Sequence, residues 1–188
     1  LAAGLSQLNK KILVIDLDPQ GNATTGLGLS NMDNSSDTIY GVLNGTKEIG
    51  EVIKKTQFEN LDIITSNVDL SGLEVETADD SNRAFILKTK LAPYLNNSRD
   101  SYDYILIDCP PSLSLLTVMA LVCSSSLLVP LQTEFFALEG LTQLLKTINR
   151  IKSSLNKSLE VEGILLTMFD KRNKLCSQVE DEARKFFS

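Results

Sequence analysis

Short apolar runs alternate with longer segments of helical periodicity along this chain. The run from Lys11 to Asp16 is apolar at nearly every position, as expected of a parallel strand covered on both faces. Similar runs predict four further strands, at residues 61–65, 104–108, 126–131 and 163–168. Helical periodicity predicts helices over residues 82–95, 113–123, 138–155 and 176–187.

The order of these elements predicts the fold class. Strands that alternate with helices form right-handed βαβ units, so we expect an α/β fold with a doubly wound, mostly parallel sheet. The stretch from Gly21 to Gly45 is rich in Gly, Asn, Ser and Thr, which predicts a long loop with a short helix near residues 38–43. At 188 residues, and with no linker or repeat, residues 1–188 are expected to form a single domain.

The composition restricts the chemistry available to the chain. It contains no histidine, which excludes Ser-His-Asp and Cys-His nucleophile pairs, His-ligated zinc and imidazole acid–base catalysis. A net charge of −6 argues against binding nucleic acid by overall charge. No apolar run reaches the roughly 18–20 residues of a membrane span. The three cysteines lack CxxC spacing, so we expect reduced thiols in a cytoplasmic protein.

Two of the predicted strands end in aspartate. Asp16 closes the first strand, with Asp18 just after it, and Asp108 closes another. Ligands of open parallel sheets bind beyond the carboxyl ends of the strands. An apolar strand that ends in Asp is the Walker B pattern, whose carboxylate holds Mg²⁺ beside a nucleotide phosphate. Asp18 could project from the following loop to orient or deprotonate water, whereas Asp108 could instead simply cap the next helix.

The pair Asp16-x-Asp18 also allows a second interpretation. It matches the start of the DxDx[TV] nucleophile motif of aspartyl-phosphate phosphatases. Gln20 occupies the place of Thr or Val, however, and the continuation Pro-Gln-Gly-Asn fits that motif poorly. We therefore rank an aspartyl-phosphate phosphatase below an enzyme that uses water to attack a nucleotide phosphate beside Mg²⁺.

Four segments, in order, carry a family resemblance. They read DLDPQGN at 16–22, YDYILIDCPPS at 102–112, VPLQTEFFALEGL at 129–141 and GILLTMFDKRNKLCSQVEDEARKFF at 163–187. Together they resemble the ParA/Soj family of partitioning ATPases, which are deviant Walker A P-loop NTPases related to MinD. The resemblance covers essentially the whole chain.

This resemblance implies roles for individual carboxylates. Asp18 would be the switch I residue that positions the attacking water, and Asp108 the switch II Walker B residue. Asp16 would lie near Mg²⁺ and reach it through water. Asp170 falls where relatives contact the adenine, although it could equally be an ordinary loop carboxylate at a strand end.

One family motif does not occur in these 188 residues. The phosphate loop of the family has the form KGGxGK[ST]T, and no GxxxxGK[ST] is present. We expect that loop to precede Leu1 and further family segments to follow Ser188, so that the sequence is truncated at both ends. On that expectation, these residues alone would lack ATPase activity.

The resemblance also implies a function and partners. It implies an ATPase switch for chromosome or plasmid partitioning that hydrolyses ATP with Mg²⁺ as a nucleotide-sandwich homodimer on nonspecific DNA. A ParB-like centromere-binding protein would be the partner, and the location would be cytoplasmic and nucleoid-associated, without a membrane. DNA binding rests on the resemblance alone, because residues 170–188 carry five basic and four acidic side chains. The alternatives are a non-catalytic binding module and a MinD-like positioning ATPase.

Overall fold

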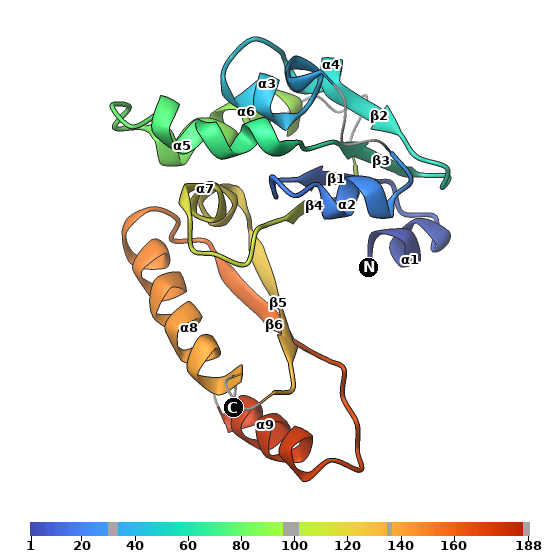
Figure 1. The fold of residues 1–188 in the computed structure, drawn as a ribbon, viewed down its shortest axis with the longest axis vertical. Coiled ribbons are helices and arrows are strands. Elements are labelled where there is room, and N and C mark those ends of the chain that lie inside the picture. The colour runs from blue at the N-terminus through green and yellow to red at the C-terminus, as the bar shows by residue number, and fades with distance from the viewer. Residues whose placement is uncertain (30–33, 96–101, 135–136, 186–188) are drawn as a thin grey trace. The chain divides into compact units, whose positions relative to one another are not determined.

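The computed structural model describes residues 1–29, 34–95, 102–134 and 137–185 (Figure 1). Its contacts divide the chain into two compact units, Leu1–Ala120 and Leu121–Ser188. The expectation of a single domain stays a prediction.

The first unit is built on a four-stranded sheet with the order β2-β3-β1-β4. Central β1 is parallel to both β3 and β4, and β2 is antiparallel to β3. Because β1 lies between two strands and under helices, all five of its residues are buried. The strands are β1 (Ile12–Asp16), β2 (Ile53–Lys55), β3 (Leu61–Ile64) and β4 (Tyr104–Asp108).

Short helices connect these strands. The predicted short helix is confirmed as α3, but the prediction of a loop from Gly21 onward is wrong for α2. Five residues are too few to show helical periodicity, so α2 left no pattern in the sequence. The helical elements are α1 (Ala2–Gln7), α2 (Asn22–Gly26), η1 (Ser35–Asp37), α3 (Ile39–Leu43), α4 (Ile49–Val52), η2 (Val68–Gly72), α5 (Leu73–Glu76), η3 (Arg83–Phe85) and α6 (Ile86–Leu95). Helix α7 (Leu115–Cys123) runs from the first unit into the second.

One face of the sheet packs against α1 and α2. Ile12 and Val14 of β1 and Leu61 and Ile63 of β3 are buried together, and the partly buried Ala2, Ala3, Leu5 and Ala23 pack against them. Each of the four buried Ile, Val and Leu side chains contributes about 1.5–3 kcal/mol on burial. This packing fixes α2 beside the end of β1, where the aspartates lie.

The second unit contains a parallel pair, β5 (Ser126–Gln132) and β6 (Glu160–Thr167), joined through α8 (Ala137–Ser154). A further helix, α9 (Lys174–Lys185), follows β6. The core of this unit comprises Val129, Leu131, Leu141 and Val179. The predicted strands and helices are confirmed here with ends shifted by a few residues, and residues 186–187 of the predicted last helix lie outside the described residues. None of the three cysteines forms a disulfide within the described part of the chain. No helix within the described residues is long and apolar enough to cross a membrane.

The start of the second unit is tied together by Asn156. Its side-chain Nδ2 donates hydrogen bonds to the carbonyl oxygens of Leu121, at 2.9 Å, and Ser124, at 2.8 Å. Its Oδ1 accepts a hydrogen bond from the hydroxyl of Ser158 at 2.8 Å. Because the last carbonyls of an α-helix have no partner within the helix, this buried amide supplies donors at the end of α7.

Candidate functional site

The carboxyl ends of β1 and β4 bring two predicted site residues side by side. Asp16 and Asp108 are paired in the parallel register of the two strands. The backbone N–H of Leu17 donates to the carbonyl oxygen of Asp108 at 2.8 Å and extends the ladder by one residue. Asp18 follows one residue later, so all three carboxylates lie at one edge of the sheet, as the sequence predicts.

The side chain of Asp16 is fully buried and holds the loop that follows β1. Its Oδ1 accepts a hydrogen bond from the backbone N–H of Asp18 at 3.1 Å. Its Oδ2 accepts from both the backbone N–H and the hydroxyl of Thr24, each at 2.7 Å. The carboxylate therefore connects the strand end to the first turn of α2.

The loop between β1 and α2 is shaped by Gly21 and by the side chain of Asp18. Gly21 has φ 65° and ψ 33°, a left-handed conformation that glycine adopts without steric penalty. Its N–H donates to the carbonyl oxygen of Asp18 at 2.9 Å. The Oδ1 of Asp18 accepts from the N–H of Gln20 at 3.0 Å, and Asp18 is 8% exposed. The carboxylate that we predict to be catalytic is thus largely buried and oriented by its own loop.

The pKa of Asp108 reports the negative charges of Asp16 and Asp18 nearby. Partial burial raises its pKa above the ordinary value, and the charges of Asp16 and Asp18 raise it further. A hydrogen bond from the backbone of Cys109 acts in the opposite direction. A cation bound at this edge would relieve the repulsion, which makes the edge electrostatically suited to a divalent metal.

The donor chemistry fits Mg²⁺ at two of the three carboxylates. Within the described residues, no three His, Cys, Asp or Glu side chains are grouped to hold a metal by themselves. Mg²⁺ commonly uses one or two carboxylates and completes its octahedron with water and substrate phosphates, so Asp108, with Asp16 reaching the ion through water, would provide enough oxygen donors. The oxygens of Asp16 already accept three hydrogen bonds, and its predicted role near Mg²⁺ through water stays a prediction.

Residues after β3 join this site without any signal in the sequence. The backbone N–H of Ser66 donates to the hydroxyl of Thr24 at 3.0 Å, and both residues are fully buried. The Ser66 hydroxyl is buried with no hydrogen-bond partner. Thr24 and Ser66 stand 42 positions apart, and neither belongs to a motif that would pair them.

Comparison with known proteins identifies the family. The AAA domain family matches residues 1–161. The chain is 44% identical over 187 residues to the chromosome partitioning protein ParA of Caulobacter vibrioides, covering 100% of this chain and 69% of the relative. It is also 44% identical to the sporulation initiation inhibitor protein Soj of Bacillus subtilis, covering 72% of that relative. The chain belongs to the ParA/Soj family of chromosome partitioning ATPases.

Solved structures agree with this assignment. The chain matches cobyrinic acid a,c-diamide synthase from Mycobacterium smegmatis, with bound ATP analog and magnesium, with a TM-score of 0.88 and 33% identity over 98% of this chain and 71% of that one. A plasmid partition protein from Borrelia burgdorferi matches with a TM-score of 0.78 and 28% identity over 96% of this chain and 75% of that one. These matches confirm the predicted α/β fold of the P-loop NTPase class. Nucleotide with magnesium in such neighbours is consistent with their binding in the family.

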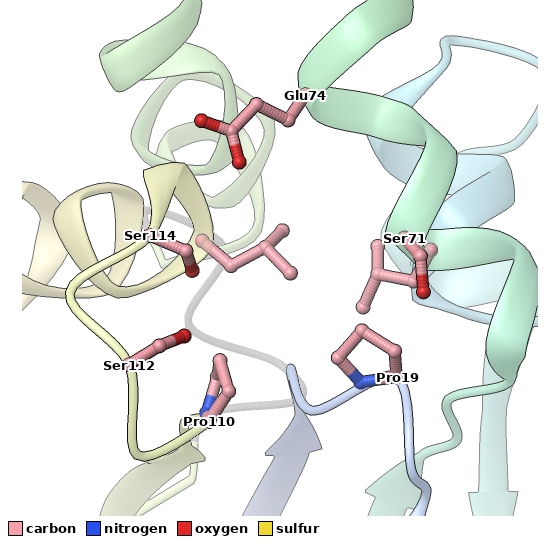
Figure 2. A pocket seen from close by; sticks show the side chains of 8 residues that line it. Pro19, Ser71, Glu74, Pro110, Ser112 and Ser114 are labelled. Atoms are coloured by element: carbon pink, nitrogen blue, oxygen red, sulfur yellow. The ribbon is translucent and has the colours of Figure 1, made fainter.

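A small cleft in the first unit lies beside the loops that follow β1 and β4. Figure 2 shows Pro19 and Pro110 at its base, with Ser112 and Ser114 on one side, Ser71 on the other and Glu74 above. Its volume of about 150 Å³ is below the roughly 300 Å³ of a typical small-molecule site. The cleft is therefore too small to hold a nucleotide by itself.

The fourth predicted site residue, Asp170, belongs to the second unit. Its carboxylate pairs with the guanidinium of Arg172, with Oδ2 2.8 Å from Nη2 and Oδ1 3.1 Å from Nε. These hydrogen bonds, helped by the backbone N–H of Arg172, lower the pKa of Asp170. The pair is solvent-exposed, which is the arrangement of an ordinary loop carboxylate. A contact with adenine stays a prediction.

Proposed function

We propose that this protein is a ParA-type ATPase in which Asp18 positions the attacking water and Asp108 helps to hold Mg²⁺. The observation that carries the proposal is the register of β1 and β4, which sets Asp16 beside Asp108 and brings Asp18, two residues after Asp16, to the same sheet edge. Family membership supports ATP as the nucleotide. The proposed reaction is transfer of the terminal phosphoryl group of ATP to water.

The geometry at the sheet edge suits that reaction. Phosphoryl transfer needs positioning and charge stabilisation more than covalent chemistry from the protein. The N–H of Asp18 is fixed by Asp16, and its Oδ1 is fixed by Gln20, so its carboxylate can accept a hydrogen bond from a water in a defined direction. Bound Mg²⁺ would supply charge neutralisation for the phosphate oxygens. Asp108, crowded by two like charges, is a favourable site for such a counter-charge.

The wider role extends this proposal. We place the protein in DNA partitioning as an ATP-dependent homodimer that binds nonspecific DNA and responds to a ParB-like centromere-binding protein in the cytoplasm, at the nucleoid. Support comes from the partitioning functions named for the relatives, which include both chromosome and plasmid systems.

Steady-state ATP hydrolysis by the full-length protein tests the site. Asp18→Ala should lower kcat by about 10²–10⁴-fold, the usual contribution of a positioned acid–base group, while ATP and Mg²⁺ still bind. Asp79→Ala is the matched control, because Asp79 is an exposed aspartate of the same unit and should leave kcat unchanged. An Asp18→Ala protein that hydrolyses ATP at the original rate would overturn the assignment. Binding of ATP without turnover by the unchanged protein would favour the non-catalytic binding module.

A further inference from the structure

We infer that Thr24 is a positioning residue for Asp18 and acts through the buried carboxylate of Asp16. This inference rests on the proposed function, because it concerns the orientation of the carboxylate that we assign to the attacking water. Thr24 is not among the site residues predicted from the sequence. Its importance appears only in the folded chain.

The hydroxyl of Thr24 is the point where three segments meet. It donates to Asp16 Oδ2 at 2.7 Å and accepts from the backbone N–H of Ser66 at 3.0 Å. Asp16 ends β1, Thr24 lies in α2, and Ser66 follows β3. Asp16, Thr24 and Ser66 are all fully buried, so these bonds are made away from competing water and hold a single geometry.

The effect reaches Asp18 through the other oxygen of Asp16. When Oδ2 is held by Thr24, the plane of the carboxylate is fixed, and Oδ1 points at the N–H of Asp18. That bond sets the position at which the Asp18 side chain leaves the backbone. Without the Thr24 hydroxyl, Oδ2 keeps only the N–H of Thr24 as a donor, so the carboxylate is held by two hydrogen bonds instead of three and can rotate more freely.

The expected consequence is kinetic rather than a loss of binding. A displacement of about 1 Å at a reacting group can cost about 10²-fold in rate. Thr24→Val keeps the shape of the side chain and removes only the hydroxyl. We therefore expect kcat for ATP hydrolysis to fall about 10–100-fold, with KM for ATP changed by less than about twofold.

The experiment compares variants of the full-length protein. Thr24→Ser retains the hydroxyl and should keep kcat within about twofold of the original. Thr25→Val is the matched control, because the Thr25 hydroxyl bonds only to backbone carbonyls around its own helix, those of Gly21 and Asn22. It should leave kcat unchanged. In the Asp18→Ala background, Thr24→Val should cause no further fall, because its effect is transmitted through Asp18.

The outcomes separate this inference from the proposed function. If Asp18→Ala leaves kcat unchanged, the proposed function fails. If Asp18→Ala abolishes turnover but Thr24→Val keeps its kcat, or changes KM alone, the inference fails and the function stands. If Thr24→Val does not fold cooperatively by circular dichroism, Thr24→Ala, which leaves room for water beside Asp16, is assayed against the same criteria. Failure of both to fold would mean that the role of Thr24 is structural, and would overturn the inference.

Discussion

The buried amide of Asn156 gives a prediction whose size can be worked out from its contacts. Asn156→Ala removes two N–H donors from the carbonyl oxygens of Leu121 and Ser124. Each carbonyl that loses its partner costs about 1–3 kcal/mol. For the two carbonyls together, we therefore expect the free energy of unfolding to fall by about 2–6 kcal/mol.

Asn156→Asp should be worse, and in a pH-dependent way. The introduced carboxylate would face two carbonyl oxygens in a site where Asn156 is 5% exposed, so burial and repulsion would raise its pKa in the folded chain. A raised folded-state pKa means that stability is lost as pH rises from the ordinary Asp value through the raised one. Over that interval the loss is about 1.4 kcal/mol per pH unit, whereas Asn156→Ala introduces no titrating group.

Urea unfolding followed by circular dichroism at 222 nm, at pH 5.5 and 7.5, measures both effects. The difference in unfolding free energy between Asn156→Asp and Asn156→Ala should widen at the higher pH. Ser153→Ala, which removes an exposed hydroxyl from the end of α8, controls for local helix effects. Equal values for Asn156→Asp and the original protein at pH 7.5 would refute the reasoning.

Two further predictions concern the first unit. Asp108→Asn should raise the free energy of unfolding at pH 7, because the raised pKa of Asp108 makes its charged form unfavourable in the folded state. The gain should disappear near pH 4. Urea titrations that show no gain at pH 7 would contradict this prediction. Gly41→Ala should lower stability by about 1–3 kcal/mol, because the new Cβ would lie 2.1 Å from the carbonyl oxygen of Ser36. Gly50→Ala has open space and should be neutral or stabilising, so similar melting shifts for the two glycine variants would count against the predicted clash.

Strands β1 and β3 were predictable because burial on both faces imposes a continuous apolar run, and β4 carries such a run although it is only partly buried. The segment at residues 104–108 was predicted with the bounds that the structure has, and β1 differs by one residue. Strand β2 was missed because Ile53-Lys54-Lys55 is short and carries two charges at the sheet edge. Three residues are too few to show the alternation or the apolar run by which a strand is recognised.

The site was predictable only where it follows the chain locally. Asp16, Asp18 and Asp108 stand at the ends of apolar runs, and the rule for parallel sheets brings such ends together. Thr24 entered the site because α2 folds back onto Asp16, and Ser66 because β3 lies beside β1. Both are hydrogen bonds between common polar residues, one of them across 42 positions, and a single sequence carries no signal for them.

The buried charge of Asp16 has a consequence for the sign of what can approach the sheet edge. Its three hydrogen-bond donors are two backbone amides and a hydroxyl, all uncharged. Its negative charge contributes to the raised pKa of the neighbouring Asp108. A fixed negative charge in a low-dielectric interior is weakly screened. Such a potential disfavours a free polyphosphate anion more than the same anion partly neutralised by a divalent cation. We therefore expect the edge to favour the metal complex of a nucleotide, with Asp16 exerting that bias through its charge.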